Sequence, residues 1–389
     1  MTEVNGATDV IAPTGTVHWM GAGLSTGSGL AAVLRTAARV RLWHRGVDRA
    51  EKALDRLGLS GRVAPRAFTP EALSAELTPG DIVVSMLPAR EHDALLRVCV
   101  DHRVHFACSS YASDTMRALD PVAAANGTVV LAEAGLDPGI DHLFAHSLIG
   151  RAGERWGDAP ARVRFTSYCG GVPAVPNAFR YRFSWAPRGV LGALRTPARH
   201  VANGVPVTAV RPWEAAVTRT VGGETFEVYP NRDSVPFIAQ YGLPPQWSVD
   251  TFVRGTLRLE GWLNAWEPVF AELRRGDDTR IASLADELAA RHPTTDSDRD
   301  RVVLTVSLDV RDDAGDTWEG HYLLDTVGDA AESAMARCVS RPLADGVGQI
   351  LHGLLPAGLT CAARGADDSE RALARLAEQG IDFTRHLPD

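Results

Sequence analysis

TVHWMGAGLSTGSG, residues Thr16–Gly29, is the stretch that decides the fold. Its first five residues predict a short strand, and the LAAVLRTA that follows predicts a helix. Strand, glycine-rich loop and helix in this order are typical of a dinucleotide-binding turn. The glycines let the backbone approach a pyrophosphate, and the helix N-terminus offers N–H groups to it. The spacing is GxGxxxG rather than GxGxxG, so a glycine-rich turn without a ligand is the alternative.

The next predicted strand indicates which dinucleotide would bind. It covers residues 38–45 and ends in His44-Arg45, about 20 residues after the glycine loop. An NAD enzyme usually has an acidic residue there, which binds the ribose hydroxyls. A cation suits the 2′-phosphate of NADP instead. We therefore predict NADP(H) as the cofactor with Arg45 at its 2′-phosphate; the alternative is an ordinary surface arginine.

Helix and strand patterns continue to alternate up to residue 135. Continuous apolar strands such as IVVSML are typical of a parallel sheet covered on both faces. We predict an α/β fold with a Rossmann-type doubly wound parallel sheet. Leu87 and Pro88 follow a buried strand, in a loop where a nicotinamide ribose often lies. The other predicted elements are helices 48–57, 70–77, 91–101 and 113–125 and strands near 62–68, 104–111 and 128–135.

The stretch AGLDPGIDH, residues 134–142, follows the last of these strands. Pro and Gly favour a tight turn, and an ordinary turn is one interpretation. Open α/β sheets bind ligands beyond the carboxyl ends of their strands, which favours a functional turn. We predict Asp137 as a general acid, because burial would raise its pKa toward the working range. Asp141 is expected to cap a helix that starts at His142, and His142 to be structural, with proton transfer as the alternative.

From about residue 160 to 330 the pattern changes to alternating strands. Asp313-Ala314-Gly315 between two of them indicates a hairpin. We predict an inserted α+β substrate domain on a mixed or antiparallel sheet, a long amphipathic helix at 331–355, and a last helix at 370–383 that returns to the nucleotide domain. The expected boundaries are a loose tail at 1–14, a nucleotide domain of 15–135 plus 357–389, and a substrate domain of 136–356.

Composition excludes several classes of function. A net charge of −8 and the absence of a basic tract argue against nucleic acid or an anionic membrane as partner. No apolar run is long enough to span a membrane and no leader pattern is evident, so cytoplasm is expected. Five cysteines without a CxxC motif predict neither a disulfide framework nor a metal site. Lys52 is the single lysine and lies in a predicted solvated helix, which excludes Schiff-base catalysis.

The predicted second domain carries polar clusters that periodicity does not explain. YCGGVP, residues 168–173, ends a predicted strand in paired glycines, where a ligand could come close. YPNRDS (229–234) and RGTLR (254–258) place arginines at expected strand edges. Arginine can bind a carboxylate bidentately, as an amino-acid substrate requires; surface ion pairs are the alternative. Cys169 is expected to be a small contact residue rather than a nucleophile.

Six segments in this order carry a family resemblance: SSYASDTM, EAGLDPGIDH, SYCGGVPA, RYRFSWAPRGVL, VYPNRDS and FVRGTLRLEGW. Together they closely resemble saccharopine reductase, the NADP-dependent, glutamate-forming saccharopine dehydrogenase family. The likeness extends from about residue 16 to the terminal LAEQGIDF. It implies condensation of α-aminoadipate semialdehyde with glutamate and reduction of the imine by NADPH, in a homodimeric enzyme of amino-acid metabolism.

The resemblance also implies roles for individual residues. Asp137, Tyr111 and Cys169 would form the catalytic part of the site. Substrate would be bound by Arg232, Arg254, Asn231 and Thr256. The cofactor would be bound by Gly21, Gly23, Leu24, Ser25, Thr26, Arg45, Leu87 and Pro88.

The chain departs from the family pattern in two places. Its glycine loop is richer in glycine than usual, and the segment between Cys169 and FSW is about three residues short, with Tyr181-Arg182-Phe183 in place of YKF. The substrates could therefore be another amine–aldehyde pair, such as one leading to a carboxynorspermidine-like or specialised opine-like product. A non-catalytic NADP-binding sensor is the alternative from another class.

Overall fold

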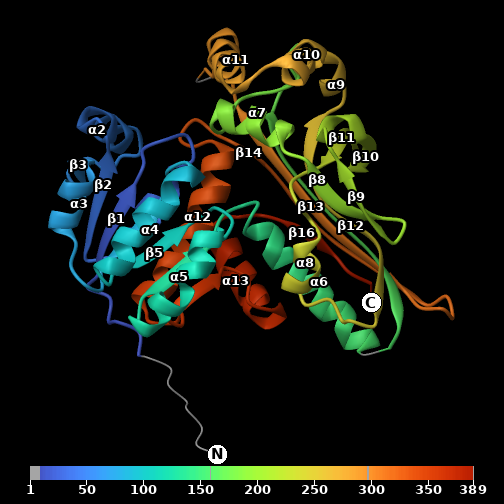
Figure 1. Ribbon diagram of the computed structural model, residues 1–389, viewed down its shortest axis with the longest axis horizontal. Helices are drawn as coiled ribbons and strands as arrows, with labels where there is room; N and C mark the ends of the chain where they lie inside the picture. The colour runs from blue at the N-terminus through green and yellow to red at the C-terminus, as the bar shows by residue number, and fades with distance from the viewer. Residues whose placement is uncertain (1–8, 158, 296–297, 389) are drawn as a thin grey trace, which may run out of the picture. The chain divides into compact units, whose positions relative to one another are not determined.

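The computed structural model describes residues 9–157, 159–295 and 298–388 (Figure 1). These residues form two compact units. The first comprises the described residues up to Ile140 together with Ala336–Arg364. The second comprises Asp141–Met335 together with the described residues from Gly365 onward. Each unit is therefore assembled from two separate parts of the chain.

The first unit contains a seven-stranded sheet in the order β15-β6-β5-β4-β1-β2-β3. Every adjacent pair is parallel, which confirms the predicted doubly wound sheet. The strand order reverses between β1 and β4, where such sheets bind their ligands. The strands are β1 (Thr16–Met20), β2 (Arg39–His44), β3 (Ala64–Ala67), β4 (Ile82–Ser85), β5 (His105–Cys108), β6 (Val129–Ala132) and β15 (Gly358–Cys361).

Two helices of this unit begin where the sequence supplies a capping side chain. Thr69 accepts a hydrogen bond from the Ala72 N–H, and Ser113 accepts one from Met116, each at 3.1 Å. Such bonds satisfy N–H groups that a helix leaves without internal partners. The helices are α1 (Ser28–Val33), α2 (Val47–Arg56), α3 (Pro70–Glu76), η1 (Ala89–Glu91), α4 (His92–Asp101) and α5 (Asp114–Ala125).

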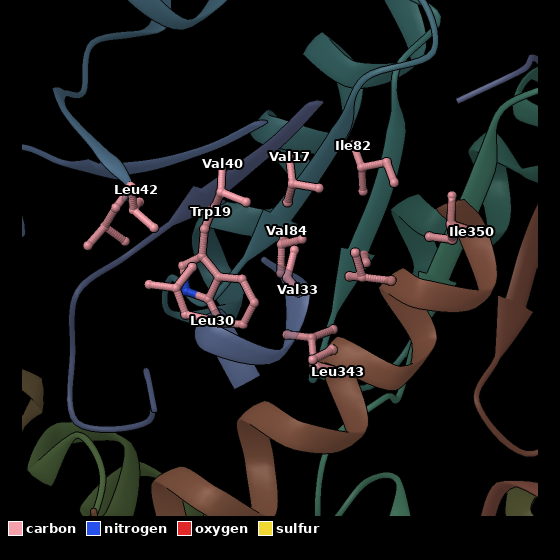
Figure 2. Packing of buried hydrophobic residues seen from close by; sticks show 14 of the residues in the cluster. Val17, Trp19, Leu30, Val33, Val40, Leu42, Ile82, Val84, Leu343 and Ile350 are labelled. Carbon is pink, nitrogen blue, oxygen red and sulfur yellow. The ribbon is translucent and has the colours of Figure 1, made fainter. Parts of the chain in front are cut away.

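The long helix α12 (Ala334–Leu351) packs on the first sheet. The predicted substrate domain of 136–356 included this helix, and that part of the prediction is wrong. Its apolar residues Leu343, Val347 and Ile350 recur at helical spacing and are buried against β1 and β4, as Figure 2 shows for Leu343 and Ile350. The amphipathic pattern predicted the helix correctly, but periodicity does not say which sheet an apolar face covers.

The second unit contains a nine-stranded mixed sheet, as predicted. Its main path is β10-β11-β12-β7-β13-β14-β16, with β12 and β7 parallel and the other pairs antiparallel. The β13–β14 hairpin turns at residues 312–316, at the predicted Asp-Ala-Gly. The strands are β7 (Ala161–Pro173), β8 (Ala198–Ala202), β9 (Val205–Ala209), β10 (Val217–Val221), β11 (Glu224–Pro230), β12 (Trp247–Leu259), β13 (Asp300–Arg311), β14 (Thr317–Val327) and β16 (Thr384–His386).

The helices of the second unit cover this sheet and form a separate aromatic core. Trp262, Trp266 and Phe270 are buried in this core, together with apolar residues of α7, α10 and α11. The helices are α6 (Ile140–Trp156), α7 (Pro187–Arg195), η2 (Pro212–Ala215), α8 (Pro236–Gln240), α9 (Trp262–Ala265), α10 (Glu267–Arg275), α11 (Asp278–Arg291) and α13 (Ala366–Glu378).

The C-terminal segment belongs to the second unit, so the prediction that it returns to the nucleotide domain is wrong. Strand β16 extends the second sheet by pairing with β14. Glu370 of α13 accepts hydrogen bonds from Ser147 Oγ at 2.6 Å and from Arg151 Nε at 3.0 Å, both on α6. These polar contacts fix α13 on α6. Strand β15, which precedes α13 in the chain, pairs with β6 in the first sheet.

The predicted loose tail of residues 1–14 is wrong for its second half. The Ile11 N–H donates to Gly127 O at 2.9 Å, and the Thr14 N–H donates to Gly80 O at 3.0 Å. These bonds attach the described part of the tail to loops of the first unit. Residues 1–8 lie outside the described residues.

Candidate functional site

The glycine loop follows β1 and is closed by a buried threonine. Gly21 has φ +108°, which favours glycine, and its N–H donates to Trp43 O at 2.9 Å. Thr26 Oγ1 donates to Gly21 O at 2.9 Å, and the Thr26 side chain is buried. Thr26, which the sequence placed at the cofactor, therefore holds the two ends of the loop together.

The remaining loop residues divide between an open side and a packed side. A Cβ at Gly23 would meet no heavy atom within 4 Å, and Leu24 is exposed. A Cβ at Gly29 would lie 2.0 Å from Ser340 O, and its N–H donates to Ser340 Oγ at 3.0 Å. Gly23 thus leaves room for a pyrophosphate beside the backbone, whereas Gly29 lets α1 contact α12. Ser25 lies between Leu24 and Thr26 and is half-buried.

Two neighbouring loops complete the fit to a dinucleotide. Arg45 is exposed directly after β2, beside a half-buried His44, so the tip of this strand presents a cation. The Met86 N–H, after β4, donates to Met20 O at 2.8 Å, and Met86 O lies 3.1 Å from a Cβ built on Gly21. Leu87 and Pro88 therefore follow a segment that borders the glycine loop. The residues at this edge suit a dinucleotide, and the exposed Arg45 offers a cation at the tip of β2.

The turn after β6 joins two residues that the sequence placed in the catalytic part. Tyr111, in the loop after β5, donates a hydrogen bond from its phenol to Asp137 Oδ1 at 2.8 Å. The Asp137–Pro138 peptide is cis, and the Gly135 N–H donates to Pro138 O at 3.0 Å. A Cβ at Gly139 would meet Gly135 O at 2.0 Å, so only glycine fits there. The turn chemistry fixes Asp137 at the carboxyl edge of the sheet.

Glu133 is a residue of this edge that sequence reasoning missed. It is 1% exposed and adopts φ +59°, in the left-handed region. Its N–H donates to Ser110 O at 2.9 Å, and its Oε1 accepts from the Ala112 N–H at 3.2 Å. Glu133 therefore holds the loop on both sides of Tyr111. The sequence feature that could have pointed to Glu133 is its position as an acidic residue directly after the apolar strand TVVLA.

The buried His92 and the half-buried Cys361, both next to this loop, are electrically neutral. Burial lowers the pKa of His92 to about 4, and its Nε2 lies 3.2 Å from Ser110 Oγ. Burial, followed by the charge of Glu133, raises the pKa of the Cys361 thiol. At neutral pH neither side chain therefore carries a charge beside this loop.

The second unit places Cys169, Arg254 and Thr256 on one face of its sheet. Thr256 on β12 pairs with Cys169 on β7 and with Tyr229 on β11, and paired residues point to the same side. Alternation along β12 places Arg254 on that face as well. The structure therefore brings together three residues that are up to 87 positions apart in the chain. Cys169 is half-buried.

The paired glycines after Cys169 do not end the strand, which was the expectation. Strand β7 continues to Pro173 and pairs throughout with β13. A Cβ at Gly170 would lie 2.2 Å from Leu257 O, and one at Gly171 would lie 2.6 Å from Ser184 Oγ. The glycines serve close packing against protein groups.

Arg254 is buried inside β12, so the expectation of a strand edge is wrong. Its Nη2 donates to Asp141 Oδ2 at 2.5 Å, and its guanidinium lies 4.1 Å from the Phe237 ring. Asp141 is correspondingly not a helix cap: α6 begins at Ile140, and the carboxylate is fully buried in this ion pair. His142 Nε2 lies 3.5 Å from Asp141 Oδ2.

Arg232 lies in the turn after β11 and is exposed, with φ +56°. The turn is fastened to β12, because the Asn231 N–H donates to Arg254 O at 2.9 Å and the Arg254 N–H donates to Ser234 Oγ at 2.9 Å. The Arg199 N–H donates to Arg232 O at 2.8 Å. Asn231 and Arg232 thus lie directly beside Arg254.

Other kinds of site find no support in the part of the chain that the structure describes. No group of three or more potential metal ligands occurs among these residues. Their five cysteines are all free thiols. None of the described helices is long and apolar enough to cross a bilayer. Lys52 is exposed on α2, as predicted.

Comparison with known proteins agrees with this geometry. Residues 17–131 match the family model "Saccharopine dehydrogenase NADP binding domain", and residues 135–381 match "Saccharopine dehydrogenase C-terminal domain". The saccharopine dehydrogenase [NADP(+), L-glutamate-forming] of Pyricularia oryzae is 34% identical over 256 residues, which are 64% of this chain and 55% of the relative. The mitochondrial alpha-aminoadipic semialdehyde synthase of Bos taurus is 37% identical over 202 residues, 50% of this chain and 21% of the relative.

The fold leads to the same family. The solved structure of apo saccharopine dehydrogenase (L-Glu forming) from Saccharomyces cerevisiae matches with a TM-score of 0.79 and 25% identity, over 96% of this chain and 100% of that one. The chain spans about half the length of the Pyricularia relative and a fifth of the bovine one. The two family models together cover most of the chain, and its first unit is an NADP-binding domain. This chain belongs to the saccharopine dehydrogenase family, a family of NADP-dependent oxidoreductases.

Proposed function

We propose that the protein is an NADP(H)-dependent oxidoreductase acting on C–N bonds. It would condense glutamate with α-aminoadipate semialdehyde and reduce the imine to saccharopine or a close opine-like secondary amine, or catalyse the reverse reaction. The observation that carries this proposal is the Tyr111–Asp137 hydrogen bond at the carboxyl edge of an NADP-binding sheet. The names of the relatives support the substrate pair.

The first unit holds the cofactor and the proton. NADPH, when bound, supplies the hydride. Gly21 and Gly23 hold its pyrophosphate by close backbone approach, and Arg45 binds the 2′-phosphate by charge. Leu87 and Pro88 contact the nicotinamide ribose.

Asp137 acts as the general acid. An imine accepts hydride well only when its nitrogen is protonated, and the preceding carbinolamine must lose water, so an acid is needed at the nitrogen. The Tyr111 phenol fixes Oδ1 of Asp137, and the proton is carried on Oδ2. In the reverse direction the Asp137 carboxylate accepts the proton from the secondary amine.

The second unit recognises the substrate. Arg232 and Arg254 bind its carboxylates, and Asn231 and Thr256 donate hydrogen bonds beside them. Cys169, which pairs with Thr256, contacts the substrate as a small side chain. We retain a homodimer, a cytoplasmic location and a place in lysine metabolism as predictions; light scattering of the purified protein tests the first.

A different amine–aldehyde pair is the alternative that the departures in sequence suggested. In the structure Arg182, which replaces the lysine of the usual YKF, donates from Nε to Asp298 O at 3.0 Å and lies 3.2 Å from Asp298 Oδ2. This contact gives Arg182 a structural partner within its own unit. Protein groups therefore hold Arg182, and a substrate assay has to decide between the two substrate pairs.

A panel of substrates tests the proposal. The protein is mixed with NADPH, the semialdehyde and one of several amines, and the molecular mass of each product is measured by mass spectrometry. We expect fast NADPH oxidation with glutamate and a product of the mass of saccharopine. Faster turnover with a polyamine would favour the alternative pair. If the protein binds NADPH tightly but oxidises it in none of the mixtures, the result would favour the non-catalytic NADP-binding sensor.

A further inference from the structure

Asp93, in the first turn of α4, is a charged residue that the proposed mechanism does not use. Its two carboxylate oxygens accept one hydrogen bond each at 2.7 Å, Oδ1 from Ser113 Oγ and Oδ2 from Thr115 Oγ1. Ser113 Oγ also accepts from the Met116 N–H at 3.1 Å, as the cap of α5. A hydroxyl has a single proton to donate, and Ser113 donates it to Asp93. Asp93 therefore fixes the start of α5, which follows the loop of Tyr111.

These hydrogen bonds keep Asp93 ionised. The Thr115 hydroxyl, together with that of Ser113, holds the pKa of this carboxyl below its usual value against the effect of burial. Arg97, one turn further along α4, adds a positive charge that acts in the same direction. A hydrogen bond to an ionised carboxylate is about twice as strong as one between neutral groups. Replacement of Asp93 by a neutral side chain should therefore loosen both hydroxyls.

His92, the residue before Asp93, holds the other side of the same loop. The residue is 2% exposed, and its Nε2 lies 3.2 Å from Ser110 Oγ. Its ring meets the ring of Phe106 on β5 edge-on, with the centroids 6.1 Å apart. Burial lowers the pKa of His92 to about 4, so a neutral imidazole makes the contact with Ser110. Hydroxyls on both sides of Tyr111 are thus bound by two adjacent residues of α4.

The same turn of α4 continues from the loop of Leu87 and Pro88. The short turn η1 (Ala89–Glu91) separates Pro88 from His92, and the Glu91 N–H donates to Pro88 O at 2.8 Å. The Leu87 backbone raises the pKa of His92 against the effect of burial, so the imidazole lies close to this loop, although its Nδ1 makes no hydrogen bond with a described residue. A short, hydrogen-bonded turn therefore connects the loop proposed at the nicotinamide ribose with the start of α4.

We propose that the His92–Asp93 pair positions the acid relative to the cofactor. Glu133, directly after β6, fixes the backbone of the Tyr111 loop to the first sheet. The His92–Asp93 pair fixes side chains of that loop to α4, and α4 follows the proposed nicotinamide loop. A shift of the nicotinamide loop on NADPH binding therefore reaches the Tyr111 phenol, which holds Asp137. The inference rests on the proposed function, because it takes Asp137 as the acid and the loop after β4 as a cofactor contact.

A pair of residues that only packs α4 against α5 would behave differently. Its loss would lower the melting temperature and leave the environment of Tyr111 as in the wild type. A double-mutant cycle separates the two roles by kcat. For Asp93→Ala we expect a fall in kcat of about tenfold with NADPH affinity retained. In the Tyr111→Phe background the same substitution should lower kcat by less than about twofold, because the group through which Asp93 acts is gone.

A second measurement needs no turnover and uses the full chain with 3-fluorotyrosine in place of its 6 tyrosines. The fluorine NMR signal of Tyr111 is identified by its loss in Tyr111→Phe. We expect saturating NADPH to shift this signal in the wild type, and Asp93→Ala to reduce the shift. Asp93→Asn keeps one acceptor oxygen, replaces the alanine variant if that does not fold, and should give an intermediate shift. The matched control is Asp114→Ala, since Asp114 is an exposed carboxylate in the first turn of α5. That variant is expected to keep the wild-type shift.

The outcomes separate this inference from the proposed function. A wild-type Tyr111 signal in Asp93→Ala, or a wild-type signal that does not respond to NADPH, would overturn the positioning role even if saccharopine is formed. Additive effects of Asp93→Ala and Tyr111→Phe on kcat would overturn it as well. A reduced NADPH-induced shift in Asp93→Ala supports the positioning role even if no imine is reduced, and the absence of turnover would then count against the proposed function alone.

Discussion

The Tyr111 phenol donates to Asp137 Oδ1 at 2.8 Å, although the two residues follow different strands and lie 26 positions apart. Glu133 holds the backbone around Tyr111, and the turn closed by Gly135 and Gly139 holds Asp137. Both partners are thus fixed before any substrate binds. Such preorganisation is what a group that protonates a transient imine requires.

Removal of the acid should reduce chemistry without affecting cofactor binding. For Asp137→Asn we expect a fall in kcat of about a hundredfold or more with an unchanged dissociation constant for NADPH. Tyr111→Phe should lower kcat by about tenfold, because Asp137 remains but loses its orienting bond. Steady-state kinetics and NADPH fluorescence titration measure both quantities. Asp313→Asn, on the exposed β13–β14 turn, is the control. Unchanged turnover in Asp137→Asn would remove Asp137 from the acid role.

Cofactor preference should depend on one exposed side chain. Arg45→Asp is expected to weaken NADPH binding by about tenfold to a hundredfold and to change NADH binding little, because only NADPH carries the 2′-phosphate. Arg49→Asp, also exposed but on α2, has the same change in charge and should affect neither cofactor strongly. Calorimetric titration with each cofactor measures the difference. Equal weakening of NADPH and NADH by Arg45→Asp would disprove the 2′-phosphate assignment.

The sequence predicted the first sheet well because each part of it has a local signal. Apolar runs indicate buried parallel strands, and glycines mark the turns between the predicted elements. The sequence did not show which sheet α12 packs on or which sheet β16 joins. An amphipathic pattern predicts that a helix face is buried, but not which element covers it. Both errors concern contacts between segments that are far apart in the chain.

The candidate site was predictable where turn chemistry or a family motif marks a residue, as at Asp137. Asp141 was misjudged because Asp near a helix start commonly caps it. Its buried ion pair with Arg254, 113 positions away, leaves no local trace. Glu133 was not predicted for the same reason. Its partners Ser110 and Ala112 are more than 20 positions away in the chain and come close to it only in the folded structure.

Glu133 should act as a positioning residue. Glu133→Ala removes the acceptor of the Ala112 N–H and should lower kcat by about tenfold while NADPH affinity is retained. Glu133→Gln keeps an oxygen acceptor of the same shape and should restore most of the lost turnover. The ratio of kcat between these two variants is the informative quantity. Equal losses in both would show that the charge of Glu133, rather than its hydrogen bond, matters.

Stability should decrease as the pH falls toward 5, partly through His146. Burial, reinforced by the charge of His142, lowers the pKa of His146 from 6.5 to about 4. Between these values the unfolded chain binds a proton that the folded chain does not, so the folded state loses stability as the pH falls. We expect His146→Phe to reduce the difference in unfolding free energy between about pH 7.5 and about pH 5 by about 2 kcal/mol. Urea unfolding at both pH values measures it, and an undiminished difference would contradict this assignment.

Transfer of the cofactor's hydride into a secondary amine tests the central claim most directly. The protein is mixed with glutamate, α-aminoadipate semialdehyde and NADPH that carries deuterium at the transferable position, and the product is analysed by mass spectrometry. We predict saccharopine with one deuterium on the carbon bonded to the new nitrogen, formed by the wild type and nearly lost in Asp137→Asn. Oxidation of NADPH without deuterium in a secondary amine, or no oxidation at all, would contradict the account.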